Sequence, residues 1–260
     1  MNRTLQWLPL ALLCMLLPGL RAFAAEPAEP MIFHLPGIGG HLLIDDMLLE
    51  GLQQGHLSGK AQILDWTMGN PGIPALGGYE RNKAQAAKIA MLLADAIRNN
   101  PNRRIIVTTH SGGAGLAVWA LESLPDGLKI DTLAMIAPAL SPKYDLSAAL
   151  KHVRSKAYSF NSLLDPILGF GTRNLGTIDR VFTESAGCVG FSPPPNADLK
   201  EYQKLSQIPY DDAWLRLGNA GDHIGAMNRP FARTIIAPLL LTGQLPRYPS
   251  TRPSSQPVGQ

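Results

Sequence analysis

The sequence has little cysteine and no strong excess of either charge. Its 260 residues include two cysteines, too few for a network of disulfide bonds that could replace a core. The 23 basic residues barely outnumber the 20 acidic ones and form no basic run of the kind that binds nucleic acid. Aromatic residues make up 7% of the chain, which gives no sign of a base-stacking surface. We therefore expect a protein built on an apolar core, with no nucleic-acid partner.

Long apolar runs are also lacking, and the one near the N-terminus is too short to span a bilayer. Arg3 precedes this run, which covers residues 7–17, and the pattern Ala22-Phe23-Ala24 follows it. A basic start, a short apolar segment and an A-x-A pattern are typical of a secretory signal peptide. We predict a signal peptide over 1–24 with cleavage after Ala24, and hence an exported protein, periplasmic or secreted. An uncleaved N-terminal anchor is the alternative.

Removal of this segment changes the cysteine count and the charge. Cys14 would be lost, which leaves Cys188 as a lone, core-type thiol, and loss of Arg3 and Arg21 would lower the formal charge from +3 to +1. No stable membrane span would remain after cleavage.

Short apolar runs alternate with helical patterns along the rest of the chain. The runs are continuous rather than alternating with polar residues, which is typical of parallel strands buried on both faces. The fold class predicted is therefore α/β, with a mostly parallel central sheet and helices on both faces. We expect strands over residues 31–35, 61–67, 131–140 and 156–165, a strand followed by a helix over 104–124, a long amphipathic helix over 80–99 and a short helix or turn over 146–152.

Turn-forming residues mark the expected domain organisation. We predict a single domain over 25–245, with a loop at 70–78 that is rich in glycine and proline. Residues 169–210 read as a loop-rich insertion that could wall or cover a site. The tail at 246–260 is rich in proline and serine, so we expect it to be disordered.

The stretch Thr109-His110-Ser111-Gly112-Gly113 stands between an apolar strand and a stretch of helical character. A serine held in a sharp turn at this point projects above the sheet, and the small residues around it let strand and helix approach closely. The general form is G-x-S-x-G, in which the serine acts as a nucleophile. Gly113 fits that form, whereas Thr109 replaces the first glycine. A turn that serves packing only is the structural alternative.

A nucleophilic serine needs a base, and the base needs an acid that orients it. His223, in the glycine-flanked stretch NAGDHIGAM, is the best candidate base. Asp165, in NSLLDPIL, is the best candidate acid because it follows a predicted strand. Asp222 is the alternative acid, although its adjacency to His223 makes the orienting geometry difficult.

Acyl transfer also needs hydrogen-bond donors for the oxyanion of the tetrahedral intermediate. The backbone N–H groups of Gly112 and Ile38 are the candidates, because the first follows the serine and the second lies in the glycine-rich loop HLPGIGG. His110, His34 and Phe170 are possible lining residues of a substrate pocket. No metal-ligand cluster and no cofactor motif is present in the sequence.

Four motifs together resemble the α/β-hydrolase superfamily, of the lipase and esterase type. These are LPGIGG, THSGG, LLDPI and GDHIG, which occur in the order in which that family places its oxyanion loop, nucleophile, acid and base. The resemblance covers roughly residues 31–241. Thr109 and Pro36, the latter where many members carry a histidine, depart from the family pattern.

The resemblance implies a serine hydrolase with Ser111, Asp165 and His223 as its triad. The expected substrate is a small-molecule or lipid ester, cleaved through an acyl-enzyme intermediate without a cofactor. Two alternatives stay open: a non-catalytic binding protein with this fold, and an acyltransferase, amidase or thioesterase that uses the same triad. The sequence makes no prediction of the oligomeric state.

Overall fold

The central element of the computed structural model is a six-stranded parallel sheet. The model describes residues 28–248, so the predicted signal peptide and most of the predicted tail lie outside the described residues. The sheet has the strand order β2-β1-β3-β4-β5-β6, and every neighbouring pair runs parallel. The strands are β1 Met31–Leu35, β2 Lys60–Ile63, β3 Ile105–His110, β4 Ile130–Ile136, β5 Val153–Asn161 and β6 Leu205–Pro209.

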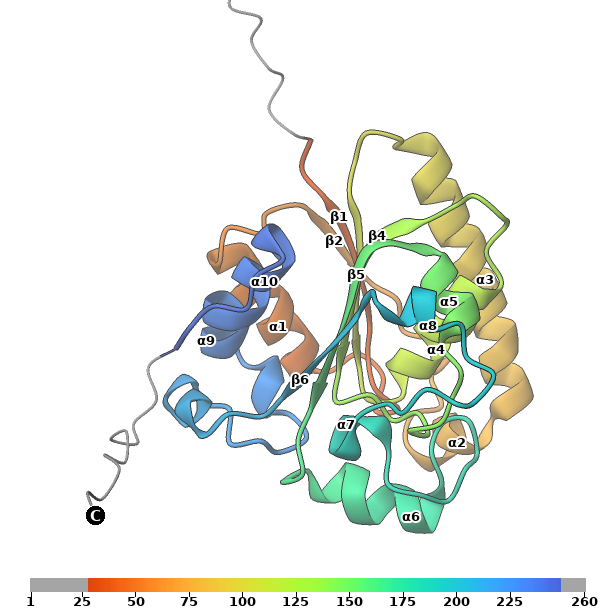
Figure 1. Cartoon of the computed structure of the whole chain (residues 1–260), viewed down its shortest axis with the longest axis vertical. Helices are drawn as coiled ribbons and strands as arrows, with labels where there is room; N and C mark the ends of the chain where they lie inside the picture. Colours follow the sequence, from red (N-terminus) through yellow and green to blue (C-terminus); the bar gives the residue numbers. More distant parts are fainter. Residues whose placement is uncertain (1–27, 249–260) are drawn as a thin grey trace, which may run out of the picture.

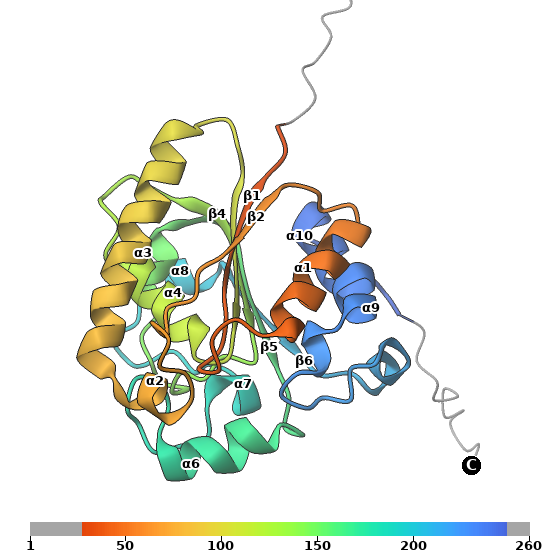
Figure 2. The same cartoon turned by 180° about the vertical axis from the view of Figure 1, so that it is seen from behind.

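Helices cover both faces of this sheet (Figures 1 and 2). Helices α3, α4, α5 and α8 lie on one face, and α1, α9 and α10 lie on the other. Their bounds are α1 Leu43–Gln54, α3 Tyr79–Asn99, α4 Gly113–Glu122, α5 Ser147–Lys151, α8 Leu199–Tyr202, α9 Arg229–Phe231 and α10 Ala237–Thr242. The predicted fold class is confirmed by this arrangement.

Two apolar clusters, one on each face, form the core. The cluster under α3 and α4 includes Trp119 and Val107, and the cluster under α1 and α10 includes Ile106 and Phe231. Successive residues of β3 thus belong to opposite clusters, because side chains along a strand point alternately to the two faces of the sheet. All six residues of β3 are buried, which explains why its sequence shows a continuous apolar run rather than an alternating one.

Short elements gather at the carboxyl ends of the strands, at the bottom of Figure 1. They are α2 Ile73–Gly77, α6 Thr172–Leu175 and α7 Ala186–Val189. A π-helical turn, η1 Ile167–Gly171, leads into α6. Three further helical turns precede α9 or α10 in the chain: η2 Asp212–Leu217, η3 Gly225–Met227 and η4 Ala232–Ile236.

Several predicted boundaries were wrong. The loop predicted at 70–78 contains α2, because Pro74 lies in the first helical turn, where no intrahelical N–H donor is needed. The predicted strand over 61–67 ends at Ile63, and the one over 156–165 occupies 153–161. The segment 169–210 contains β6, an edge strand whose side chains are mostly half-buried or exposed and which therefore lacks a strong apolar run.

Candidate active site

Ser111 occupies a strained turn between β3 and α4. Its φ angle is +52°, a left-handed conformation that costs free energy in any residue with a Cβ. Hydrogen bonds fix this backbone: the Ser111 N–H donates to the carbonyl of Ile136 at 3.0 Å, and the Ser111 carbonyl accepts from the N–H groups of Ala114 and Ala139 at 3.1 Å each. The ends of β3 and β4 thus hold the serine in one orientation.

Gly113 permits the close contact between α4 and the chain that follows β1. A Cβ atom at this position would stand 2.3 Å from the carbonyl oxygen of Leu35 and 2.4 Å from that of Pro36. These are backbone atoms that cannot rotate away, so glycine is required here. The other end of the motif differs, because Thr109 is fully buried in β3 and its hydroxyl oxygen has no hydrogen-bond partner.

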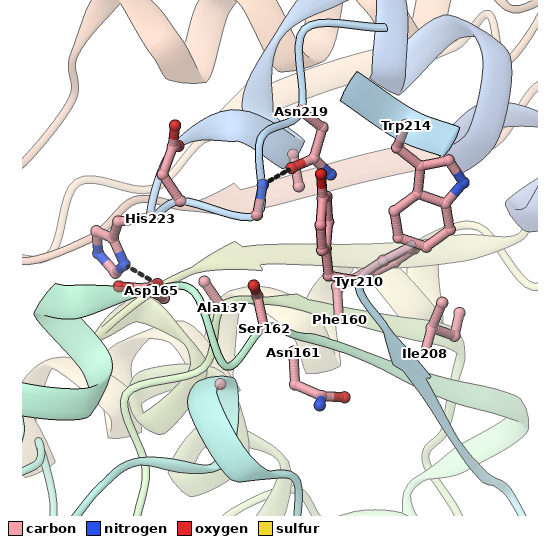
Figure 3. Close-up of a pocket in the computed structure, with 14 residues that line it drawn as sticks. Ala137, Phe160, Asn161, Ser162, Asp165, Ile208, Tyr210, Trp214, Asn219 and His223 are labelled. Atoms are coloured by element: carbon pink, nitrogen blue, oxygen red, sulfur yellow. Dashed lines mark hydrogen bonds and ion pairs between the residues drawn. The ribbon is translucent and has the colours of Figure 1, made fainter. Parts of the chain in front are cut away.

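Ser111, His223 and Asp165 form a continuous hydrogen-bond chain. The Ser111 Oγ atom lies 3.0 Å from His223 Nε2, and His223 Nδ1 lies 2.8 Å from Asp165 Oδ2. An ionised carboxylate only accepts, so the proton of a neutral imidazole resides on Nδ1 and Nε2 is free to accept the serine proton. Asp165 is 2% exposed and faces His223 in Figure 3.

Asp165 lies four residues beyond the end of β5 and not at the strand end, where the sequence placed it. Its second oxygen, Oδ1, accepts hydrogen bonds at 3.0 Å from the backbone N–H groups of Ile167 and Leu168, the first turn of η1. The side chain therefore caps η1 with one oxygen and contacts His223 with the other. This double anchoring holds the carboxylate in place.

The alternative acid, Asp222, has a different role in the structure. Its Oδ1 atom accepts from the backbone N–H groups of Ile224 at 3.0 Å and Gly225 at 2.6 Å. The side chain is exposed, and its recorded hydrogen bonds go to its own loop rather than to the imidazole. Asp222 shapes the loop that carries His223, whereas Asp165 is the carboxylate that contacts the ring.

Gly112 and Ile38, whose N–H groups are the predicted oxyanion donors, are neighbours in the structure. A Cβ atom on Gly112 would stand 2.9 Å from Cγ2 of Ile38. The Ile38 loop is fastened by the N–H of Gly72, which donates to the Ile38 carbonyl at 2.7 Å, and by the Trp66 indole, which donates to the Pro36 carbonyl at 2.8 Å. Within residues 28–248, neither the Ile38 N–H nor the Gly112 N–H has a recorded acceptor.

A cavity of about 210 Å³ opens beside Ser111. Its lining is mainly apolar and comes from the Ile38 loop, the start of α1, η1 and the His223 loop. The lining residues are Gly37, Ile38, Gly39, Gly40, Leu42, Ile44, Asp45, His110, Ser111, Ile167, His223 and Ile224. Residues of the predicted wall at 169–210 are absent from this lining; Ile167, just before that segment, supplies part of it.

Of the three predicted lining residues, His110 alone lines this cavity. His34 is fully buried below it, where Nε2 lies 2.8 Å from Asp45 Oδ1 and Nδ1 lies 2.9 Å from the Thr108 hydroxyl. Phe170 is 74% exposed and lies outside the lining, to which η1 contributes Ile167. His34 and Phe170 are therefore not among the residues that line this cavity.

Sequence reasoning missed Ile44, Asp45 and Ile224 in the wall. The first two belong to α1, for which the sequence analysis made no prediction, although Asp45, Leu48 and Leu52 lie at helical spacing and are buried. Ile224 follows the predicted base directly, so the wall position could have been inferred from the position of His223. The helical spacing in the sequence could have predicted α1 directly, whereas the wall position of Ile224 followed only indirectly, from its neighbour His223.

His110 contacts His223 through the backbone of that residue. Its Nε2 atom lies 2.9 Å from the backbone carbonyl oxygen of His223, and the two ring centroids are 4.8 Å apart. Burial, together with the nearby His223, lowers the pKa of His110 to about 4. The ring is therefore neutral at physiological pH, and because a carbonyl only accepts, its proton resides on Nε2.

A smaller cavity of about 30 Å³ is also lined by His223 (Figure 3). Phe160, Tyr210 and Trp214 provide its apolar wall, and Asp165 and His223 form one edge. His223 lines both this cavity and the one beside Ser111. His223 is thus shared by the two cavities, and Ser111 lines the larger one.

Across residues 28–248, no group of three or more His, Cys, Asp or Glu side chains has an arrangement that could hold a metal ion. No helix in the same part of the chain is both long and apolar enough to cross a membrane.

The parallel sheet, the turn at Ser111 and the order of the three hydrogen-bonded residues define the α/β-hydrolase fold. Comparison with solved structures agrees: Aspergillus fumigatus lipase B matches with a TM-score of 0.53 at 11% identity, over 85% of this chain and 54% of that chain. This chain thus corresponds to about half the length of that lipase.

Two further solved structures match less closely. A cutinase-like protein from Cryptococcus sp. gives a TM-score of 0.40 at 12% identity, over 79% of this chain and 90% of that one. The type II thioesterase BorB gives 0.42 at 15% identity, over 84% and 94%. No family model and no curated protein matches the chain. At 11% identity, the match to the lipase establishes the fold alone.

Proposed function

We propose that this protein is a serine hydrolase that cleaves an acyl bond, with a carboxylic ester as its substrate. The observation that carries the proposal is the pair of hydrogen bonds from Ser111 to His223 and from His223 to Asp165, at 3.0 Å and 2.8 Å. A serine in a strained turn, a histidine of the correct tautomer and a buried carboxylate are the parts that acyl transfer requires. The fold comparisons are consistent with this class.

In the proposed reaction, Ser111 Oγ attacks the ester carbonyl carbon while His223 Nε2 takes the serine proton. The carbonyl π bond opens, and the resulting oxyanion is held by the N–H groups of Ile38 and Gly112. The oxyanion then reforms the carbonyl, the bond to the alcohol breaks, and His223 returns the proton to the leaving oxygen. Water repeats the sequence on the acyl-enzyme, which releases the acid and restores Ser111. Asp165 stabilises the imidazolium in both halves.

The mainly apolar wall of the 210 Å³ cavity supports a small-molecule or lipid ester rather than a highly charged substrate. We further propose that the protein is exported. This rests on the sequence of residues 1–24, and it predicts a mature chain that begins at Ala25. The intact mass of protein secreted by its host or recovered from the periplasm tests that boundary.

The decisive experiment is intact mass spectrometry after treatment with a fluorophosphonate, which reports an activated serine without assumptions about the acyl group. We expect one adduct on the wild type and none on Ser111→Ala. Ser185→Ala is the matched control, because Ser185 is a fully buried serine outside the hydrogen-bond chain; this variant should label like the wild type. Circular dichroism verifies that each variant is folded.

Failure of the folded wild type to react would overturn the proposal and favour a non-catalytic binding protein with this fold. With labelling established, product analysis in the presence of added alcohols or amines separates hydrolysis from acyl transfer. Parallel assays with an ester, a thioester and an amide of the same acyl group then determine the bond that is cleaved.

A further inference from the structure

His110 presents a hydrogen-bond acceptor to the cavity that the proposed reaction does not use. Its side chain is only 5% exposed, and it contributes to the wall beside Ser111. Nε2 donates to the His223 carbonyl at 2.9 Å, which leaves a lone pair on Nδ1. Within the described part of the chain, no hydrogen bond to Nδ1 is recorded.

Gly37 keeps this acceptor accessible close to the nucleophile. A Cβ atom on Gly37 would stand 3.3 Å from His110 Nδ1 and 3.2 Å from Ser111 Cβ. The space that the missing side chain leaves is therefore bordered by the acceptor on one side and by the nucleophilic residue on the other. An acyl group attached to Ser111 has its first carbons within reach of Nδ1.

The other polar side chains of the wall offer no donor to this acceptor. Asp45 is also an acceptor, and its oxygens already receive hydrogen bonds from His34, at 2.8 Å, and from the N–H of Leu42, at 2.7 Å. Ser111 and His223 are engaged with one another. Apart from the loop backbone, the remaining wall is apolar. Nδ1 is not among the buried atoms that lack a partner, so it is accessible from the cavity. A ligand that brings a donor can take the place of water at this acceptor.

We propose, on the basis of the proposed hydrolase function, that His110 Nδ1 selects a substrate whose acyl group carries a hydroxyl close to the scissile carbonyl. The substrate class is a short hydroxyacyl ester, in which the hydroxyl on carbon 2 or 3 donates to Nδ1. A cavity of about 210 Å³ with a mainly apolar wall suits a short acyl chain. His110 thereby acquires two roles: Nε2 positions His223, and Nδ1 recognises substrate.

The test compares the kcat/KM values of the wild type for matched methyl esters. Methyl 2-hydroxybutanoate and methyl 3-hydroxybutanoate carry the donor, methyl butanoate lacks it, and methyl 3-fluorobutanoate withdraws electrons without donating. We expect at least one hydroxy ester to exceed both controls by about tenfold, the size of one well-formed hydrogen bond. Similar kcat/KM values for hydroxy and fluoro esters would overturn the proposal.

The same acceptor could instead receive an amide N–H, and a second matched pair separates that source of the donor. Methyl N-acetylglycinate and methyl 4-oxopentanoate differ only by an NH group in place of a CH2 group. A preference confined to this pair would replace the hydroxyacyl assignment with an N-acylaminoacyl one, and so would overturn the proposal as stated.

Two variants separate the roles of the two ring nitrogens. His110→Gln can retain a donor near the position of Nε2 but removes the acceptor at Nδ1. His110→Asn places an oxygen near the position of Nδ1 but loses the donor to His223. We expect both variants to have lower kcat/KM values than the wild type. The ratio of kcat/KM for the hydroxy ester to kcat/KM for the fluoro ester should fall to about one in His110→Gln and stay near its wild-type value in His110→Asn. An unchanged ratio in folded His110→Gln would contradict the assignment.

Fluorophosphonate labelling of each protein distinguishes failure of this inference from failure of the proposed function. A wild type that labels at Ser111 but shows no hydroxyl preference retains the hydrolase proposal and rejects the role of Nδ1. If a variant does not fold, the wild-type ratios still decide the matter, because they require no substitution.

Discussion

The Nε2 atom of His110 donates a hydrogen bond to the backbone carbonyl oxygen of His223, across 2.9 Å. The residue that precedes the proposed nucleophile in the chain thus supports the loop that carries the proposed base. This contact requires a neutral His110 with its proton on Nε2, and the low pKa that burial imposes on His110 keeps the ring in that state. The consequence is a specific dependence of stability on pH.

The free energy of unfolding should fall as the pH is lowered from about 6.5 towards 4. Unfolded His110 takes up a proton near its ordinary pKa of 6.5, whereas in the folded protein it does so only near 4. Between these values the unfolded state binds more protons, so acid favours unfolding, by roughly 3 kcal/mol over the full range. Urea unfolding at pH 7 and pH 4.5 measures the loss.

His110→Gln provides the control for that prediction, because glutamine does not titrate. Other groups that titrate in this range contribute to both proteins and cancel in the comparison. The variant should therefore lose about 2–3 kcal/mol less than the wild type between the two pH values. Equal losses in the two proteins would show that His110 is not a buried neutral group.

Asp165→Asn should reduce the rate of acylation by orders of magnitude, about 10⁴ by analogy with other serine–histidine–aspartate sites. An amide in place of the carboxylate no longer favours the Nδ1–H tautomer or the imidazolium. The rate constant for fluorophosphonate labelling measures this without a known substrate. Asp222→Asn is the matched control: its amide oxygen can still accept from Ile224 and Gly225, so labelling should change less than tenfold. A reversed pattern would make Asp222 the functional acid.

The sequence predicted the fold class and the hydrogen-bond chain because their signals are local. A buried central strand such as β3 has a continuous apolar run, and the turn between β3 and α4 requires small residues at fixed positions beside Ser111. Asp165 and His223, the proposed acid and base, were singled out because they follow recognisable elements in the expected order. Each of these inferences used a short stretch of neighbouring residues. Only the order of the motifs along the chain is a long-range signal.

The assembly of the cavity wall was harder to predict than these local features, because it depends on contacts between distant segments. Ile44, Ile167 and Ile224 come from three separate parts of the chain and meet only once the sheet is formed. The position of Phe170 shows the same limit: both Ile167 and Phe170 of η1 are apolar and exposed, but only Ile167 lines the cavity. The short edge strand β6 escaped notice because an exposed edge needs no apolar run.

Thr109, which replaces the first glycine of the G-x-S-x-G pattern, leads to a prediction about stability. Its hydroxyl oxygen is buried without a partner, so Thr109→Val removes an unsatisfied polar group at nearly constant volume and should leave stability unchanged or raise it by about 1 kcal/mol. Thr108→Val is the control, because the Thr108 hydroxyl lies 2.9 Å from His34 Nδ1; its loss should cost about 1–3 kcal/mol. Thermal and urea unfolding measure both, and a larger loss for Thr109→Val would indicate a hidden partner.

Gly113 tests whether the close approach of α4 to β1 holds the nucleophile in place. Gly113→Ala would put a methyl group 2.3 Å and 2.4 Å from two backbone oxygens, so the helix must move or the fold must loosen, at a cost of about 3 kcal/mol or more. Gly77→Ala, on α2 with no atom within 4 Å of the added Cβ, should stay within about 1 kcal/mol of the wild type. The free energy of unfolding, measured with urea, and the rate of fluorophosphonate labelling should both fall in Gly113→Ala. The displaced helix would move the Gly112 N–H and the Ser111 turn with it. A Gly113→Ala protein that is as stable and as reactive as Gly77→Ala would mean that strand and helix can separate without disturbing the serine.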